Sequence, residues 1–253
     1  MVVRPITKRK STRRCFIFVS DLHLSPQTIE KNQLFYQLLQ DWRANIDGLY
    51  ILGDFFDYWL GDDDDNEFIR EMRHNLQQFS SVTKLYFRGG NHDFGVGKVF
   101  AAECGMQLIN DMHIVEIAEK RILLSHGDTF CTLDLGYQKM KKILQHPITM
   151  FILRKIPLFL RYKLKEKLEK KSHAQTGSKP DYIYQVVDDS IVEYILKYQA
   201  DAVIHGHTHR PGHYSVQLAD GRIIPRYEIP DWEDNLPGGY IIAEDSQITI
   251  HQV

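Results

Sequence analysis

The stretch "KLYFRGGNHD" (residues 84–93) joins a short apolar run, typical of a buried β-strand, to a polar cluster of Asn, His and Asp. Four more apolar runs end in the same way: "CFIFVS" precedes Asp21, "LYIL" precedes Gly53, "RILLS" precedes His126 and "DAVI" precedes His205. Helical patterns such as "NQLFYQLLQDWRA" lie between them. This repeated order predicts an α/β protein whose functional site lies at the ends of strands.

Length and composition favour one globular domain. The chain has 253 residues, 43% of them hydrophobic, which is enough for a packed core. Its three cysteines form no CxxC pair, so we expect a reducing, cytoplasmic environment and no disulfide framework. Residues 1–14 read as a flexible basic tail before a domain at 15–253, because the apolar run "CFIFV" is shorter than the roughly 7–15 residues of a signal peptide's apolar region.

Charge is distributed unevenly along the chain. Residues 139–179 carry twelve Lys or Arg and two Glu, a local charge of +10, whereas the whole chain has a net charge of −2. This block lies in a region with helical patterning, about 135–198, which interrupts the strand series and reads as an inserted helical cap. The block is either a helical hairpin with a solvated basic face or an interfacial element that meets anionic lipid or an amphiphilic substrate.

The polar clusters at the strand ends offer metal ligands. In chain order they read "DLH" (21–23), "GDFFD" (53–57), "GNHD" (90–93), "HGD" (126–128) and "HGHTH" (205–209). Carboxylate, imidazole and amide oxygen ligands together suit Mn, Fe or Zn. Asp54 could bridge two cations about 3.5–4 Å apart. By contrast, the acidic stretch "GDDDDNE" (61–67) lacks the spacing of an EF-hand and reads as a solvated turn near the mouth of this site.

The series resembles the calcineurin-like metallophosphoesterases, whose pattern DxH, GDxxD, GNH(D/E), H, GHxH is matched over residues 16–209. The resemblance implies an α/β (α+β) four-layer sandwich of two β-sheets flanked by helices, and two divalent metal ions, with Mn favoured over Fe or Zn. It implies that one metal is held by Asp21, His23, Asp54 and His209, and the other by Asp54, Asn91, His126 and His207. Asp57 and Asp128 are expected to orient ligand histidines.

Longer segments resemble one branch, the UDP-2,3-diacylglucosamine hydrolases of lipid A biosynthesis. They are "LSHGDTFCTLDLGYQ" (124–138), "FILRKIPLFLRYKL" (151–164), "HGHTHRP" (205–211) and "YEIPDWEDNLPGGYII" (227–242). The resemblance implies cleavage of the pyrophosphate of UDP-2,3-diacylglucosamine to UMP and 2,3-diacylglucosamine 1-phosphate. It implies substrate contacts at Asn91, His92, Asp134, Tyr137, Ser172, Thr176, Lys179 and His207.

Two positions differ from that branch. Thr176 stands where the branch usually has Asn, and His92 stands where it typically has Arg. His92 could donate a hydrogen bond to a phosphate oxygen or protonate a leaving group, so it is the candidate catalytic residue.

Other functions remain open from the sequence. The main alternative is a metallophosphoesterase with another substrate: a broad phosphodiesterase, a nucleotide pyrophosphatase or a nuclease. A nuclease more often has an open basic and aromatic groove, so we expect no nucleic-acid partner. A non-catalytic scaffold is the other alternative, although the candidate ligand positions all hold ligand-competent residues. We expect a lipid-linked UDP-sugar substrate, peripheral binding to the cytoplasmic face of the inner membrane through its anionic surface, and no obligate protein partner.

Overall fold

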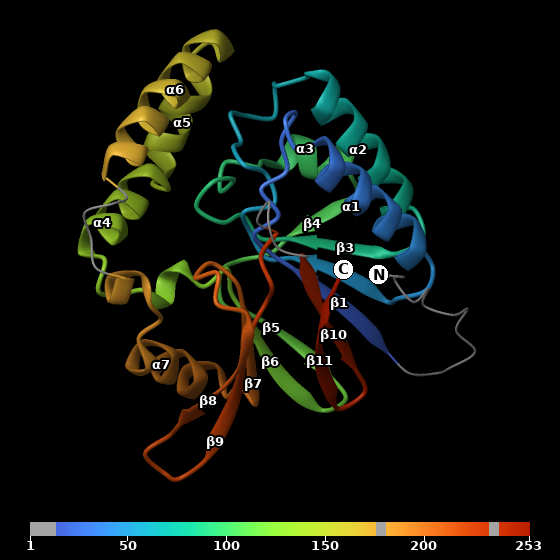
Figure 1. The fold of residues 1–253 in the computed structure, drawn as a ribbon, viewed down its shortest axis with the longest axis vertical. Helices are drawn as coiled ribbons and strands as arrows, with labels where there is room; N and C mark the ends of the chain where they lie inside the picture. Colours follow the sequence, from blue (N-terminus) through green and yellow to red (C-terminus); the bar gives the residue numbers. More distant parts are fainter. Residues whose placement is uncertain (1–13, 176–180, 233–237) are drawn as a thin grey trace.

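Two β-sheets packed face to face form the centre of the molecule (Figure 1). The computed structural model describes residues 14–175, 181–232 and 238–253. The first sheet has the strand order β11-β10-β1-β2-β3-β4 and the second has the order β5-β6-β7-β9-β8. All five apolar runs predicted to be strands are confirmed as β1, β2, β3, β6 and β7.

The first sheet holds four parallel strands from the first half of the chain. Its strands are β1 (Cys15–Val19), β2 (Gly48–Ile51), β3 (Lys84–Phe87), β4 (Met106–Leu108), β10 (Gly239–Glu244) and β11 (Gln247–Gln252). β1, β2, β3 and β4 pair in parallel, whereas β10 pairs antiparallel with β1 and with β11. The carboxyl ends of β1, β2 and β3 therefore meet at one edge, where the first three polar clusters follow.

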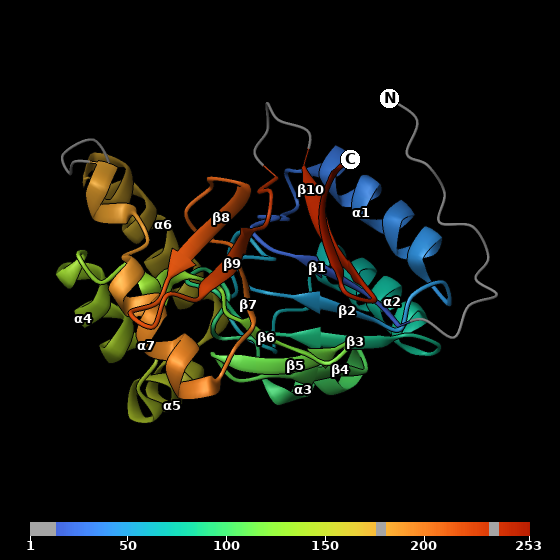
Figure 2. The same ribbon diagram turned by 90° about the horizontal axis from the view of Figure 1, so that it is seen from below.

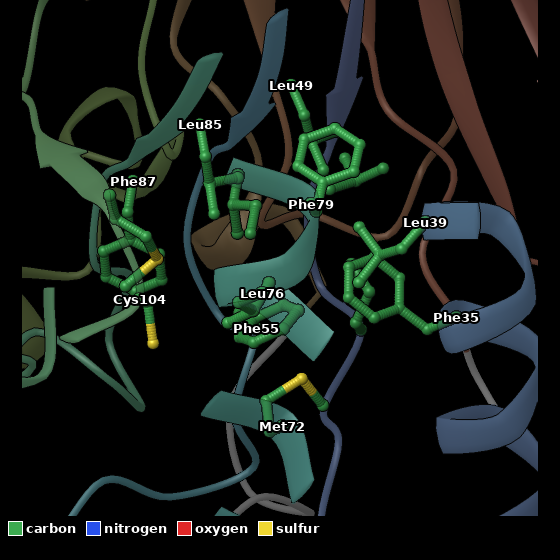
Figure 3. Close-up of a cluster of buried hydrophobic side chains, with 14 of the residues drawn as sticks. Phe35, Leu39, Leu49, Phe55, Met72, Leu76, Phe79, Leu85, Phe87 and Cys104 are labelled. Carbon is green, nitrogen blue, oxygen red and sulfur yellow. The ribbon is translucent and has the colours of Figure 1, made fainter. Parts of the chain in front are cut away.

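Three helices cover the outer face of this sheet: α1 (Ile29–Trp42), α2 (Glu67–Ser80) and α3 (Lys98–Glu103). Buried side chains of α1 and α2, among them Phe35, Leu39, Leu76 and Phe79, pack on strand residues such as Leu49 (Figure 3). The side chain of Asn66 accepts a hydrogen bond from the backbone N–H of Ile69 and so fixes the start of α2. Burial of this apolar layer holds the strand ends in place.

The second sheet faces the first through a shared apolar layer. Its strands are β5 (His113–Ile117), β6 (Lys120–Leu124), β7 (Ala202–His205), β8 (Gly212–Gln217) and β9 (Ile223–Glu228). Phe18 and Leu52 of the first half pack with Ile122 and Ile204 of the second sheet. The outer face is covered by the 3-10 turn η1 (Asp128–Phe130) and α7 (Asp188–Tyr198), whose Ile191 is buried. The predicted α/β four-layer sandwich of the calcineurin-like kind is thus confirmed.

Three helices project from the sandwich: α4 (Leu135–Leu144), α5 (Pro147–Lys155) and α6 (Leu158–Gln175) (Figures 1 and 2). α4 and α5 lie wholly in the described part of the chain, and none of their residues is buried. The short turn η2 (Asp181–Tyr184) leads from this arm to α7, which packs into the core. The region expected as a cap therefore consists of a projecting arm, α4–α6, and a helix of the sandwich.

Candidate metal centre

Backbone pairing continues past the strands and brings the polar clusters together. The N–H of Asp21 donates to the carbonyl oxygen of Gly53 at 3.0 Å, and the N–H of His23 donates to the carbonyl oxygen of Asp54 at 3.0 Å. In the second half, the N–H of Gly206 donates to the carbonyl oxygen of His126 at 2.8 Å. The loops after β1, β2, β6 and β7 are thereby joined in two pairs.

One cluster of ligand-competent side chains consists of Asp21, His23 and His209, whose ligand atoms lie within 4.8 Å of one another. Oδ1 of Asp21 lies 3.6 Å from Nε2 of His209. The rings of His23 and His209 have centroids 5.9 Å apart. The backbone N–H of His207 also donates to Oδ2 of Asp21, although 186 positions separate the two residues. The first and last motifs of the series, "DLH" and "HGHTH", therefore meet in space.

A second cluster consists of Asp54, His126 and His207, again with ligand atoms within 4.8 Å. Nε2 of His126 lies 3.5 Å from Oδ2 of Asp54 and 3.0 Å from Oδ1 of Asn91. Nδ1 of His126 lies 2.9 Å from the carbonyl oxygen of Leu52, so this nitrogen carries the proton and Nε2 faces the cluster. The structure thus brings together the side chains that the family resemblance implies as metal ligands.

The donor set fits bound cations. Oδ1 of Asp21 and Nε2 of His23 are buried and have no hydrogen-bond partner among the described residues, which costs free energy unless another group binds them. Burial lowers the pKa of His126, but the attraction of the Asp54 carboxylate outweighs it and raises this pKa to about 10. The local field therefore favours positive charge between these carboxylates, as a cation site requires.

Backbone strain is concentrated at the same residues. Asp21, His23, Asp54, His207 and His209 all have positive φ, between 48° and 78°. Such angles are uncommon for residues other than Gly and are maintained where the surrounding structure demands them. A Cβ at Gly90 would overlap the Asp54 carboxylate, and one at Gly206 would overlap the Asp21 carboxylate, so glycines stand where the loops approach closest.

Asp93, for which no role was predicted, organises two of these loops. Its fully buried carboxylate accepts hydrogen bonds from the backbone N–H groups of Asp54, Phe55, Phe56 and Gly90. Burial and the nearby Asp54 carboxylate raise its pKa to about 6, against the opposing effect of these hydrogen bonds. In the sequence, Asp93 could have been recognised by its position as the last residue of the motif "GNHD".

The carboxylates that contact the histidines differ in part from expectation. Oδ1 of Asp57 lies 3.7 Å from Nδ1 of His23, as an orienting residue should. Asp128 instead accepts hydrogen bonds from the Tyr137 hydroxyl at 2.5 Å and forms an ion pair with Lys141 at 2.8 Å. Asp231 lies 3.6 Å from Nδ1 of His209, a contact that the sequence did not reveal.

His92 lies beside the first cluster. Its backbone N–H donates to Oδ1 of Asp54 at 2.9 Å, and its ring meets that of His23 edge to face with centroids 4.8 Å apart. Nδ1 lies 2.7 Å from the carbonyl oxygen of Asp57, which can only accept, so Nδ1 carries the proton. Nε2 then bears a proton only when the ring is positively charged.

The residues expected to touch substrate fall into two groups. Asp134 caps α4 by accepting the N–H of Tyr137 at 2.9 Å, and the Tyr137 ring lies 6.0 Å from that of His207. Tyr137 therefore borders the second cluster. Thr176 and Lys179 lie outside the described residues; Ser172 lies on α6, and its side chain is likewise not described.

The acidic turn is not simply solvated, so that expectation was wrong. Asp62 accepts hydrogen bonds from the backbone N–H groups of Gly97, Val99 and Phe100 at the start of α3. Asp63 pairs with Arg161 through both carboxylate oxygens, and buried Asp64 accepts from the hydroxyl of Tyr162 at 2.6 Å. The turn thus attaches α6 to the sandwich.

Comparisons with known proteins agree with this geometry. The family model for calcineurin-like phosphoesterases matches residues 16–211. A protein of Pseudomonas syringae pv. tomato named UDP-2,3-diacylglucosamine hydrolase is 37% identical over 232 residues, which cover 91% of this chain and 92% of the relative. A protein of the same name from Ectopseudomonas mendocina is 38% identical over 218 residues, 86% of this chain and 90% of the relative. A third, from Psychromonas ingrahamii, is 34% identical and covers 92% and 95%.

Proposed function

Because the chain belongs to the calcineurin-like phosphoesterase family, we propose that it is a metal-dependent hydrolase that cleaves UDP-2,3-diacylglucosamine. The observation that carries this proposal is the likeness to UDP-2,3-diacylglucosamine hydrolases, which extends over about nine tenths of both chains and so includes the projecting arm. The products would be UMP and 2,3-diacylglucosamine 1-phosphate, as in lipid A biosynthesis.

The proposed ligands divide between the two clusters. Asp21, His23 and His209 would hold one cation and Asn91, His126 and His207 the other, with Asp54 shared. Two divalent cations, Mn²⁺ in our proposal, would supply an activated water and offset the charge of the phosphoryl oxygens. The unpartnered Oδ1 of Asp21 and Nε2 of His23 support this assignment.

The chain's own residues would orient the reacting groups. Asp57 and Asp231 hold the rings of His23 and His209, and Asp93 fixes the backbone that carries Asp54. His92, when positively charged, could donate its Nε2 proton to a phosphoryl or leaving-group oxygen beside the first cluster. Tyr137 borders the second cluster, where it could contact the substrate.

The projecting arm suits a substrate with two acyl chains. Large apolar side chains on or next to α4–α6 are exposed: Leu133, Leu135, Met140, Ile143, Ile148, Phe151, Ile152, Phe159, Leu160 and Leu164. A water-soluble substrate would not explain so much exposed apolar surface. The same segment carries most of the local charge of +10 over residues 139–179. We propose that the arm receives acyl chains and meets the anionic cytoplasmic face of the inner membrane.

Hydropathy gives no reason to expect an integral membrane anchor in the described part of the chain. Among the described residues, no helix is long and apolar enough to cross a membrane.

The reaction itself is tested by product analysis in ¹⁸O-labelled water. Purified protein with Mn²⁺ is incubated with UDP-2,3-diacylglucosamine, and the products are identified by mass spectrometry. The proposal predicts UMP that carries the label and unlabelled 2,3-diacylglucosamine 1-phosphate. Release of UDP, or label in the sugar phosphate alone, would contradict the proposed site of attack.

A further inference from the structure

Glu228, the last residue of β9, lies beside the loop that carries His207 and His209. β9 lies between β7 and β8 in the second sheet (Figure 2), and it is parallel to β7, so its carboxyl end is next to the start of this loop. Glu228 is 1% exposed and is paired across the two strands with His205. It belongs to none of the five motifs, so its place here was not predicted.

One oxygen of Glu228 holds the loop on both sides of His209. Oε1 accepts a hydrogen bond from the hydroxyl of Thr208 and another from the backbone N–H of Arg210 at 2.9 Å. Burial raises the pKa of Glu228 to about 7. Oε1 can accept both hydrogen bonds whether or not Oε2 carries a proton, so the contact does not depend on the charge of the carboxyl group.

Arg226, two residues earlier on the same face of β9, holds the start of the loop. Its Nη1 lies 2.9 Å from Nε2 of His205 and 3.7 Å from Oε2 of Glu228. Nδ1 of His205 lies 2.8 Å from the carbonyl oxygen of Gly206, which can only accept. Nδ1 therefore carries the proton, and Nε2 accepts a hydrogen bond from Arg226. β9 thus supports the loop at its start through Arg226 and near its end through Glu228.

The loop needs this support because its backbone is strained at both proposed ligands. φ is 78° at His207 and 53° at His209, angles that cost free energy for residues other than Gly. The N–H of His207 donates to Asp21, which is itself a proposed ligand of the first metal. The residues on either side of His209 are held by Glu228, which belongs to neither cluster.

The chain after Glu228 returns to the first cluster. Asp231, three residues later, lies 3.6 Å from Nδ1 of His209. The N–H of Trp232 donates to the carbonyl oxygen of Asp21 at 3.0 Å. Asp231 thus contacts the ring of His209, whereas Glu228 contacts the backbone around it. This short segment therefore supports two members of the first cluster.

We propose that Glu228 is a positioning residue of the first metal site, because it fixes the backbone on both sides of His209 and so places that ring beside Asp21. This inference rests on the two-metal part of the proposed function and is independent of the substrate. Residues that hold ligands in place typically change metal affinity by roughly 10–100-fold when they are removed. Loss of Glu228 should therefore weaken one cation site and spare the other.

Four variants test this role: Glu228→Ala, Glu228→Gln, Thr208→Val and, as a matched control, Thr83→Val. Gln keeps a side-chain oxygen that can accept both hydrogen bonds, whereas Val lacks the hydroxyl of Thr. Thr83 is a buried residue just before β3, outside the ligand loops, and its hydroxyl accepts the N–H of Ala44 at 2.9 Å. Calorimetry measures the binding of Mn²⁺ to each metal-free protein with no substrate present.

The parent protein and Thr83→Val should bind two Mn²⁺ ions with equal affinities. Glu228→Ala should weaken one of the two sites by roughly 10–100-fold and leave the other nearly unchanged. Thr208→Val should weaken the same site by about fivefold, the size of one neutral hydrogen bond. Glu228→Gln should bind Mn²⁺ nearly as the parent protein does.

Combined variants identify the site that is weakened. His209→Ala removes a proposed ligand of the first site, and His126→Ala removes one of the second. Glu228→Ala should add little to the effect of His209→Ala, because both act on the same ligand. It should further weaken the Mn²⁺ binding that remains in His126→Ala.

Equal weakening of both sites would overturn the inference, because it indicates general damage to the second sheet. So would Mn²⁺ binding by Glu228→Ala equal to that of Thr83→Val, or a loss that Glu228→Gln shares in full. If Glu228→Ala does not fold, Thr208→Val decides: weakening of one site supports the inference, and unchanged binding overturns it.

The same titrations separate this inference from the proposed function. A parent protein that binds two Mn²⁺ ions without cleaving the lipid nucleotide refutes the proposed substrate alone, and the variants still decide the role of Glu228. A parent protein that binds no Mn²⁺ refutes both the metal centre and the role of Glu228.

Discussion

Asp54 connects the two clusters of proposed ligands. Its Oδ2 faces His126 at 3.5 Å, its carbonyl oxygen accepts the N–H of His23, and its Oδ1 accepts the N–H of His92. The residue has a φ of 49° and is almost fully buried. Burial raises the pKa of this carboxyl, but His126 outweighs burial and holds the pKa well below its usual value. A permanently charged carboxylate at this point suits a shared metal ligand.

Asp54→Ala should abolish turnover and remove most of the bound Mn²⁺, because both sites lose a ligand. Metal content by mass spectrometry and UMP release measure the two effects. Asp220→Ala, at an exposed turn between β8 and β9, is the control and should bind metal and turn over like the parent protein. Near-native turnover by Asp54→Ala would sink the two-metal proposal.

His92→Ala should lower kcat by roughly 10²–10⁴-fold if this ring donates a proton or a hydrogen bond in the transition state. His74→Ala serves as control, since His74 is on α2, where its ring lies 2.7 Å from the side-chain amide of Gln78. Steady-state kinetics with the lipid nucleotide measure both variants. If kcat falls no further in His92→Ala than in His74→Ala, His92 has no part in the chemical step.

At the residue scale, the sequence predicted which side chains would form the two clusters. It did not predict every carboxylate that orients their histidine rings. The five motifs contain every member of the two clusters because each motif follows the carboxyl end of a strand, β1, β2 or β3 in the first sheet and β6 or β7 in the second. Asp231 could not be found in this way. Its place beside His209 depends on the hydrogen bond from the N–H of Trp232 to the carbonyl oxygen of Asp21, which joins distant parts of the chain.

At the scale of elements, the contact between the acidic turn and α6 decides where the arm lies. Arg161 also donates to the carbonyl oxygens of Leu60 and Ile156, so one buried guanidinium joins the turn, the α5–α6 link and α6. From the sequence, "GDDDDNE" read as a solvated turn, because nothing local indicates a partner about a hundred residues away. The pairing of Asp63 with Arg161 spans 98 positions.

Arg161→Met should loosen α6 without unfolding the sandwich. The loss of its charged hydrogen bonds is expected to lower the free energy of local unfolding of α6 by about 1–2 kcal/mol. The cost is small for a charged pair because Asp63 is largely exposed and solvent screens it. Amide hydrogen exchange in residues 158–167 should then accelerate roughly tenfold, while β1, β2 and β3 keep the exchange of the parent protein. Unchanged exchange in α6 would show that other contacts hold the arm.

The arm should bind anionic vesicles more tightly than neutral ones, because each basic residue near an anionic surface contributes about 1 kcal/mol. Sedimentation with phosphatidylglycerol-containing and pure phosphatidylcholine vesicles measures this. Salt should weaken binding to the anionic vesicles. Equal partitioning to both kinds of vesicle would remove the electrostatic part of the membrane proposal.

At the scale of the whole molecule, the rigid sandwich and the projecting arm have separate tasks in our account. The sandwich buries three apolar layers and holds the ligand loops, whereas the arm exposes apolar and basic side chains next to them. Five of the strands were predictable from the sequence because the apolar pattern of each run is local. The four-layer arrangement came from the family resemblance, since periodicity alone does not specify how two sheets face each other.

The most direct test of the account compares two substrates. Purified protein is assayed with UDP-2,3-diacylglucosamine and with bis(p-nitrophenyl) phosphate, each with Mn²⁺ and after removal of metal by EDTA. The account predicts metal-dependent release of UMP and a kcat/KM that strongly favours the lipid nucleotide. Turnover of the simple diester without turnover of the lipid nucleotide would contradict the proposed substrate, and turnover that survives EDTA would contradict the metal centre.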